Sequence, residues 1–137
     1  MSEIVVGYDG SDCAKSALSK AAELANSLGD KLVLVFGYAP GGYGGGEVPA
    51  QREAVKELGE RVTQEGAKLA ADAKADCEVE LVAEHPFHAL MEVAEKRAAR
   101  MIVVGSHGEG PLKGAVLGST PYKLVQLSET PVLVVRP

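Results

Sequence analysis

Short apolar runs alternate along the chain with longer segments in which apolar residues recur every three or four positions. The short runs predict β-strands, and the longer segments predict amphipathic helices. The five runs are Glu3–Tyr8, Leu32–Phe36, Glu78–Ala83, Met101–Val104 and Pro131–Val135. Strands that alternate with helices predict one three-layer, Rossmann-like α/β domain, in which helices cover both faces of a five-stranded, mostly parallel sheet.

Capping residues give the expected helix boundaries. Ser11 and Asp12 are both suited to cap the start of the first helix, and Gly29 is suited to end it. The later helices are expected from Ala50, from Pro86 and over Val116–Leu127. The glycine-dense segment Tyr38–Pro49 predicts a loop. Long loops in compact domains often serve as lids, so the role of Gly41–Gly46 stays open between a closing loop and plain disorder.

Three segments with distinctive chemistry follow predicted strands. Asp9 follows the first strand, Phe36–Tyr38 closes the second, and the loop that begins at Gly105 follows the fourth. Ligands of parallel α/β sheets bind outside the carboxyl ends of the strands. We therefore expect these segments to meet at one edge and form a binding site there.

The glycine loop after the fourth strand has the order that suits an anion: a strand, glycines, then a helix start. Backbone N–H groups at a helix N-terminus point at such a ligand. A Walker A loop is excluded because Pro111 follows Gly110, and the dinucleotide pattern G-x-G-x-x-G is also absent. The alternative is that these glycines serve only tight turns.

The spacing of this loop, Gly105-x2-Gly108-x9-Gly118-Ser119, resembles the nucleotide-binding motif G-x2-G-x9-G-(S/T) of the universal stress protein family. The opening IVVGYDGS resembles the first strand of that family with its acidic residue. The segment MIVVGSHGEGPLKGAVLGS is similar to the fourth strand and its loop, and TPVLVVRP is similar to the last strand. The least similar part lies between Tyr38 and Ala75. The resemblance implies an adenine nucleotide alpha hydrolase-like fold and places the chain in the ATP-binding-motif branch.

The resemblance implies that ATP or AMP binds at the carboxyl edge of the sheet. It places ten residues around the nucleotide, namely Tyr8, Asp9, Gly37, Gly105, Ser106, His107, Gly108, Gly118, Ser119 and Thr120. Asp9 would lie at the ribose or adenosine end, Gly37 would contact adenine through its backbone, and Gly105 would underlie the ribose. Gly108, Gly118 and Ser119 would cradle the phosphates.

Two departures from the family pattern bear on the phosphates. Glu84 stands where the family often has a glycine, and Pro121 stands where it often has a hydroxyl residue. Pro121 removes one N–H and one hydroxyl from the cradle, which weakens the case for triphosphate more than the case for adenosine. Lys113 is the cation nearest the loop in sequence, so backbone N–H groups and the helix dipole would carry most of the binding. Mg²⁺ remains a possible companion of the phosphates.

The function expected from the resemblance is regulation of a stress response through nucleotide occupancy. A slow Mg²⁺-dependent ATPase and a nucleotide-free dimeric interaction module are the alternatives. A Ser-His-Asp catalytic site is a further hypothesis, with Ser106, His107 and Asp9 as its members. Neighbouring residues at a strand end tend to point to opposite sides, which argues against a proton passing between Ser106 and His107. No G-x-S-x-G motif occurs, so we expect no catalytic residue.

Other classes of function are disfavoured by residue type and charge. The net charge of −5 argues against nucleic acid as a partner, because phosphate backbones need a positive field. His85 and His88 lie three residues apart near a helix start, which is too few ligands for structural zinc, so no metal site is expected. Cys13 and Cys77 fall in different predicted elements and are expected to be free thiols.

The ends of the chain bear on location and assembly. The first residues lack a secretory signal pattern, and no apolar stretch approaches the roughly 18 residues that span a bilayer. We therefore expect a cytoplasmic protein without membrane contact. The last apolar strand, Val132–Val135, is expected at a sheet edge, where it invites pairing with another chain. Related proteins commonly dimerise through this strand, so a homodimer is expected.

Overall fold

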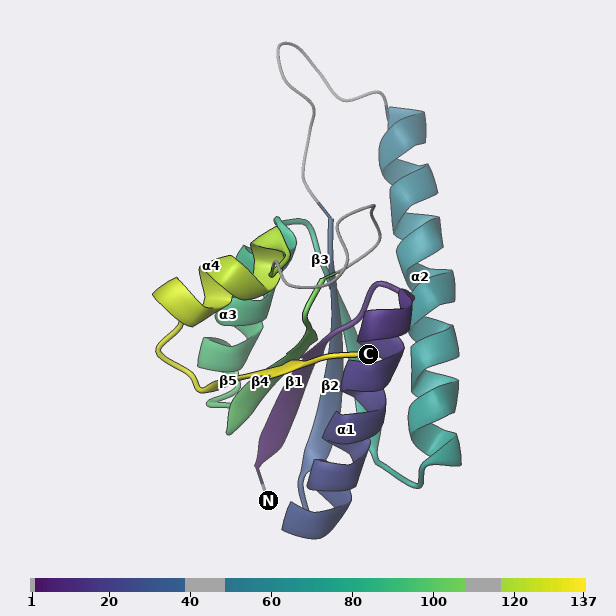
Figure 1. Cartoon of the computed structure of the whole chain (residues 1–137). Coiled ribbons are helices and arrows are strands. Elements are labelled where there is room, and N and C mark those ends of the chain that lie inside the picture. Colours follow the sequence, from purple (N-terminus) through teal and green to yellow (C-terminus); the bar gives the residue numbers. More distant parts are fainter. Residues whose placement is uncertain (1, 39–48, 108–116) are drawn as a thin grey trace.

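Five parallel strands form the central sheet of the protein (Figure 1). The computed structural model describes residues 2–38, 49–107 and 117–137. The elements in chain order are β1 (Glu3–Gly7), α1 (Asp12–Leu28), β2 (Lys31–Gly37), α2 (Pro49–Asp72), β3 (Cys77–Val82), α3 (Pro86–Lys96), β4 (Met101–Gly105), α4 (Ser119–Leu127) and β5 (Val132–Val135). The strand order is β3-β2-β1-β4-β5, which confirms the predicted α/β fold and places β5 at an edge.

Helices cover both faces of the sheet, with α1 and α2 on one side and α3 and α4 on the other (Figure 1). Successive strand side chains point to opposite faces, so each strand feeds two cores. Ile4 and Val6 of β1 pack in the core under α1, whereas Val5 packs with Ile102 of β4 in the core under α3. Burial on both faces explains why the central strands are continuous apolar runs.

The start of α1 follows the expected capping chemistry. Ser11 is the N-cap, and its hydroxyl oxygen accepts a hydrogen bond from the Ala14 N–H at 3.1 Å. This settles the choice between Ser11 and Asp12, because Asp12 is already the first helical residue. Gly29 ends the helix in the left-handed conformation, with φ +70°.

The fourth helix begins later than the sequence pattern predicts. Helix α4 starts at Ser119, and Gly118 precedes it as an extended N-cap residue, with φ −64° and ψ 167°. The Gly118 N–H donates to the Ser106 carbonyl at 2.8 Å, directly after β4, while the Gly118 carbonyl accepts the first helical hydrogen bond from the Tyr122 N–H at 3.1 Å. Val116, where the helix was expected to start, lies outside the described residues. Pro121 falls in the first turn, as expected.

Ion pairs connect the elements at the amino end of the sheet. The Arg97 guanidinium, at the end of α3, contacts Glu3 of β1 and both Glu78 and Glu80 of β3. Arg100 pairs with the carboxylate of Asp30, which also accepts a hydrogen bond from the Ser2 N–H. These contacts lie at the end of the strands opposite to the predicted binding edge. In the described ranges, no helix has the length and apolar character needed to cross a membrane.

Candidate functional site

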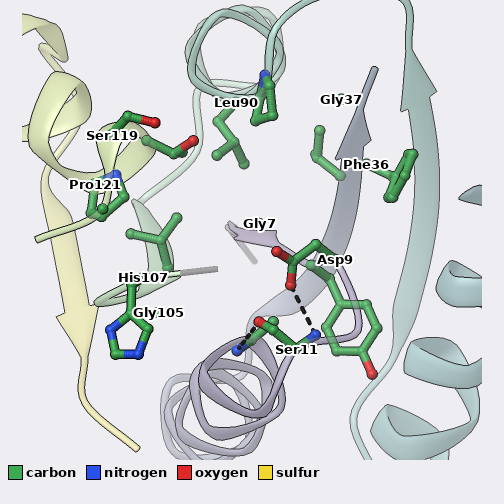
Figure 2. A pocket seen from close by; sticks show the side chains of 17 residues that line it. Gly7, Asp9, Ser11, Phe36, Gly37, Leu90, Gly105, His107, Ser119 and Pro121 are labelled. Carbon is green, nitrogen blue, oxygen red and sulfur yellow. Dashed lines mark hydrogen bonds between the residues drawn. The ribbon is translucent and has the colours of Figure 1, made fainter. Parts of the chain in front are cut away.

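A cavity of about 430 Å³ lies at the carboxyl ends of the central strands (Figure 2). Eight of the ten residues expected around a ligand line it: Tyr8, Asp9, Gly37, Gly105, His107, Gly118, Ser119 and Thr120. Ser106 does not line the cavity, and Gly108 lies outside the described residues, as do Lys113 and the loop Gly41–Gly46. The prediction that segments following separate strands meet at one edge is correct.

Asp9 presents a carboxylate to this cavity. One of its oxygens accepts a hydrogen bond from the Ser11 N–H at 2.9 Å, which fixes the side chain against the start of α1. Figure 2 shows the carboxylate near the middle of the pocket. The residue is exposed, so its second oxygen is available to donors such as ribose hydroxyls.

Tyr8 belongs to the cavity wall, but its hydroxyl group points to α2. The hydroxyl donates to Glu65 at 3.3 Å, and the same Glu65 oxygen lies 3.5 Å from the Lys15 ammonium group. Burial, together with the nearby Glu65 carboxylate, raises the pKa of Tyr8 to about 12. The phenol therefore stays protonated at neutral pH and ties β1 to α2.

Gly37 is a glycine because the chain packs closely against it. A Cβ atom there would lie 2.8 Å from the Cα of Pro86 and 2.9 Å from the carbonyl oxygen of Glu84. The connection between β3 and α3 therefore rests on this residue. The β1–β2 ladder ends with the bond from the Tyr8 N–H to the Val35 carbonyl, so the Gly37 backbone lies beyond the ladder at the cavity wall.

Gly105 is required for packing between α1 and β4. A Cβ atom on Gly105 would lie 2.6 Å from the Cβ of Cys13 and 2.8 Å from its carbonyl group. The first turn of α1 therefore sits directly against the end of β4. This close approach brings the N-terminus of α1 to the cavity, and it requires glycine whether or not a ligand is bound.

Ser106 and His107 lie together, contrary to the sequence-based expectation. The Ser106 hydroxyl is 3.1 Å from His107 Nδ1, and the Cys13 thiol is 3.5 Å from His107 Nε2. The expectation failed because β4 ends at Gly105, so the side-chain alternation of a strand no longer applies to these residues. Asp9 is bonded to the Ser11 N–H and is not the partner of this imidazole. Ser106 is only 1% exposed, which leaves it no access to a substrate.

Three helix N-termini border the cavity, at Ser11 of α1, Pro86 of α3 and Ser119 of α4. The N-cap of α4 is a glycine, so no side chain satisfies the first amides of this helix. Ser119 and Thr120 line the cavity, while Pro121, in the third helical position, has no N–H. No lysine or arginine is present among the described lining residues. The site therefore offers backbone dipoles to an anion rather than side-chain cations.

The two thiols and the histidine pair do not line the cavity. Cys13 and Cys77 are both free, Cys13 being buried and Cys77 half-buried at the start of β3. Burial raises the pKa of the Cys77 thiol to about 11, which keeps it protonated and poorly nucleophilic at neutral pH. His85 and His88 are exposed at the start of α3. Within the described ranges, no three histidine, cysteine or carboxylate side chains gather as metal ligands would.

The sequence of this chain matches a known protein family along almost its whole length. Residues 1–136 match the model of the family described as the universal stress protein family. The chain belongs to this family. It is 35% identical to a universal stress protein of Thermus aquaticus and 30% identical to universal stress protein YxiE of Bacillus subtilis. The first match covers 97% of both chains, and the second covers 98% of both.

Solved structures of universal stress proteins share this fold, and some hold nucleotides. A universal stress protein in complex with cAMP is 29% identical, has a TM-score of 0.79, and covers 98% of this chain and 96% of its own. An Archaeoglobus fulgidus protein in complex with dAMP is 24% identical, with a TM-score of 0.76 and 98% coverage of both chains. An Arabidopsis thaliana family member with AMP bound is 14% identical, with a TM-score of 0.70, covering 99% of this chain and 92% of its own.

Proposed function

We propose that this universal stress protein binds an adenine nucleotide in the cavity at the carboxyl edge of its sheet. The observation that carries the proposal is the uncapped N-terminus of α4, which meets an apolar cavity of about 430 Å³. Free amides at a helix start favour phosphate, and an apolar cleft favours a planar base. The nucleotide complexes of the related proteins support the same assignment. On this proposal the chain belongs to the motif-bearing branch of the family.

The adenosine end would lie between β1, β2 and α3. Val35, Leu90 and Val104 supply apolar walls there, and Gly37 supplies backbone groups at the end of β2. Figure 2 shows Gly37 and Phe36 on the side of the pocket opposite Ser119 and Pro121. Asp9 lies between these two sides, within the reach of a ribose.

The phosphate end would lie at α4, and its chemistry favours one phosphate over three. Ser119 and Thr120 offer amides, whereas Pro121 offers none. The carboxylate of Asp9 adds negative charge to the same cavity. AMP therefore competes well with ATP at this site, and Mg²⁺ would help ATP by neutralising part of its charge.

The protein would act as a cytoplasmic regulator whose nucleotide occupancy reports the state of the cell. Occupancy alone stabilises a protein through mass action, by about 2.7 kcal/mol at a ligand concentration 100 times the Kd. The hydroxyl and the thiol that contact His107 belong to Ser106 and Cys13, and both side chains are buried, so neither is placed to act as a nucleophile on a bound ligand. Binding without turnover is therefore the primary proposal, and slow Mg²⁺-dependent ATP hydrolysis is the alternative.

Thermal unfolding with ligand tests the binding proposal. We expect AMP to raise the Tm of the wild-type protein, and we expect Ser119→Glu to abolish that rise. A carboxylate at the first position of α4 repels phosphate but is favourable for the helix itself, so the fold is retained. Gln126→Glu is the matched control, since it adds the same charge to an exposed position of the same helix. An unchanged response of Ser119→Glu to AMP would rule out phosphate binding at α4.

The ATPase alternative has its own test. Phosphate release that requires Mg²⁺ and disappears in Ser119→Glu, but persists in Gln126→Glu, would establish turnover at this cavity. Release that continues at the wild-type rate in Ser119→Glu would point to a contaminating enzyme. No release above background, together with a Tm shift on AMP addition, would leave binding as the function.

We also propose that the protein forms a homodimer through β5. This strand lies at the sheet edge, and its four residues are apolar and only partly buried. Tyr122 and Val125 of the neighbouring α4 are about half exposed, which adds apolar surface close to that edge. Two-fold pairing of the edge strands would bury both β5 and this apolar surface of α4, because each copy contributes the same surface to the interface. If no nucleotide binds, this dimer would be the working form of an interaction module.

A further inference from the structure

Three buried polar side chains meet at the wall of the cavity, which His107 lines and the other two do not. Cys13 comes from the first turn of α1, and Ser106 and His107 directly follow β4. The imidazole of His107 lies between the other two, with Nδ1 3.1 Å from the Ser106 hydroxyl and Nε2 3.5 Å from the Cys13 thiol. The thiol is also 3.8 Å from the hydroxyl. In Figure 2 the His107 ring points away from the middle of the pocket.

The cluster supplies a partner to each nitrogen of a largely buried imidazole. A neutral imidazole has one donor and one acceptor nitrogen, and each needs a partner when the ring is buried. His107 is 9% exposed, Cys13 4% and Ser106 1%. In the described residues, no buried side-chain nitrogen or oxygen lacks a hydrogen-bond partner. Cys13 is thus the group that ties the ring of His107 to α1.

The backbone of His107 in turn positions the start of α4. A Cβ atom on Gly118 would lie only 3.0 Å from the Cα of His107, so the two residues are in close contact. The Gly118 N–H donates to the Ser106 carbonyl at 2.8 Å. Gly118 is the N-cap of α4, and the next two residues, Ser119 and Thr120, line the cavity.

We propose that Cys13 is a positioning residue for the phosphate end of the ligand site, acting through His107. The proposal rests on the proposed nucleotide binding and names the residue of α1 that sets the α4 amides in place. Without the thiol, Nε2 of a buried imidazole loses its partner, and the ring must move to find another. That movement shifts the backbone against which Gly118 packs.

Asp9 and Gly37, at the adenosine end, are held by contacts outside this cluster. Asp9 is fixed by the Ser11 N–H, and Gly37 is fixed by the connection that leads to Pro86. Neither contact involves the thiol or the imidazole. The loss of Cys13 should therefore weaken binding of the phosphate group while leaving binding of the nucleoside unchanged.

Isothermal titration with AMP and with adenosine, using the full chain, tests this selectivity. For Cys13→Ala we expect the Kd for AMP to rise about tenfold, as befits an unsatisfied buried polar group, and the Kd for adenosine to change less than about twofold. Cys13→Ser keeps a donor and acceptor at this position and should recover most of the AMP affinity. Cys77→Ala, which removes the other thiol at the start of β3, should change neither constant.

Ser106→Ala provides a second variant, because it removes the other partner of the same imidazole. It should reproduce the selective loss of AMP affinity even if Cys13→Ala fails to fold. Equal losses for AMP and adenosine, or no loss for AMP in either variant, would overturn the proposal. A wild-type protein that binds neither ligand would refute nucleotide binding itself, which is a separate result.

Hydrogen exchange provides a readout that needs no ligand. The Gly118 amide is protected by its bond to the Ser106 carbonyl, so its exchange should accelerate in Cys13→Ala and not in Cys77→Ala. Amides of β1 and β2 should exchange as in the wild-type protein. Unchanged exchange at Gly118 would show that the thiol does not position α4, whatever the nucleotide data.

Discussion

At the scale of single residues, Gly105 and Gly37 make room for neighbouring chain at the carboxyl edge of the sheet. The motif implied that Gly105 allows a ligand to approach, yet a Cβ atom there would first meet Cys13 of α1. Gly37 likewise makes room for the backbone near Pro86. Both glycines would be needed in a ligand-free protein. Glycines in such a motif can therefore be required for close packing around a site as well as for contact with the ligand.

Gly10 gives a residue-scale prediction, because its φ of +83° is unfavourable for any side chain. Gly10→Ala should lower the free energy of unfolding by about 1 kcal/mol. It should also weaken AMP binding, since Gly10 joins Asp9 to Ser11 in the turn that holds the carboxylate. Urea unfolding and titration calorimetry measure the two effects.

Gly29→Ala is the matched control for that prediction. Gly29 has a similar φ of +70° with nothing near its missing Cβ, and it lies at the other end of α1. It should show the same loss of stability with an unchanged Kd for AMP. If both variants bind AMP like the wild type, the turn at Gly10 has no part in binding.

At the scale of elements, the two ends of the sheet have different tasks. The carboxyl end gathers helix N-termini around the cavity, whereas the amino end carries charged pairs that connect helices to strands. Asp30, in the turn between α1 and β2, is buried against Arg100, which precedes β4. Hydrogen bonds from Arg100 and from the Ser2 N–H hold the pKa of Asp30 below its ordinary value.

This pair predicts how stability depends on pH. The unfolded carboxyl binds a proton more readily than the folded one, so the contribution of Asp30 is present above about pH 4 and is lost as the pH falls further. Asp30→Asn should cost about 1–2 kcal/mol at pH 7 and progressively less toward pH 2. Urea unfolding across this range measures the difference. Asp72→Asn, at an exposed position of α2, is the control and should change the free energy of unfolding at pH 7 by less than about 0.5 kcal/mol.

At the scale of the whole molecule, the order β3-β2-β1-β4-β5 determines where the site and the open edges lie. The order reverses direction at β1, so the connections from β1 and β4 leave toward opposite faces and the cavity forms between them. The same order leaves β5 unpaired on one side. Ser106, beside the cavity, donates its N–H to Val135 at the end of β5, so the site and this edge are joined by a backbone contact.

The open edge gives a prediction about assembly. The Ile102 N–H donates to the Pro131 carbonyl and the Ser106 N–H to the Val135 carbonyl. By the alternation of a parallel ladder, the amides of Val132 and Val134 point away from β4. Val134→Pro should therefore remove a donor from the open edge of β5 without breaking the sheet, and convert the proposed dimer to monomers in sedimentation experiments.

Val134→Ala is the control for the proline variant, because it shortens the same side chain and keeps the N–H group. It should remain dimeric. A dimer that survives Val134→Pro, with the far-ultraviolet circular dichroism of the wild type, would show that association uses another surface.

The sequence by itself determined the elements, their order and the fold. Alternating strands and helices allow few topologies, because crossovers are right-handed and both faces of a parallel sheet must be covered. The strand boundaries follow from apolar runs, and Ser11 and Gly29 from local capping chemistry. These features depend on residues close in sequence. The start of α4 was placed too early because its boundary depends on a hydrogen bond from Gly118 to Ser106, a distant residue.

Only the tertiary structure decided which side chains meet around and behind the cavity. The contact of Cys13 with His107 joins residues 94 positions apart, and no pattern along the chain could reveal it. Side chains alternate between the two faces along a strand, so the sequence predicted that Ser106 and His107 point to opposite sides. That rule no longer applies to them, because β4 ends at Gly105. Periodicity encodes which face a residue occupies within an element. The direction of a side chain beyond the last strand residue depends on what packs there, and that is decided by the whole fold.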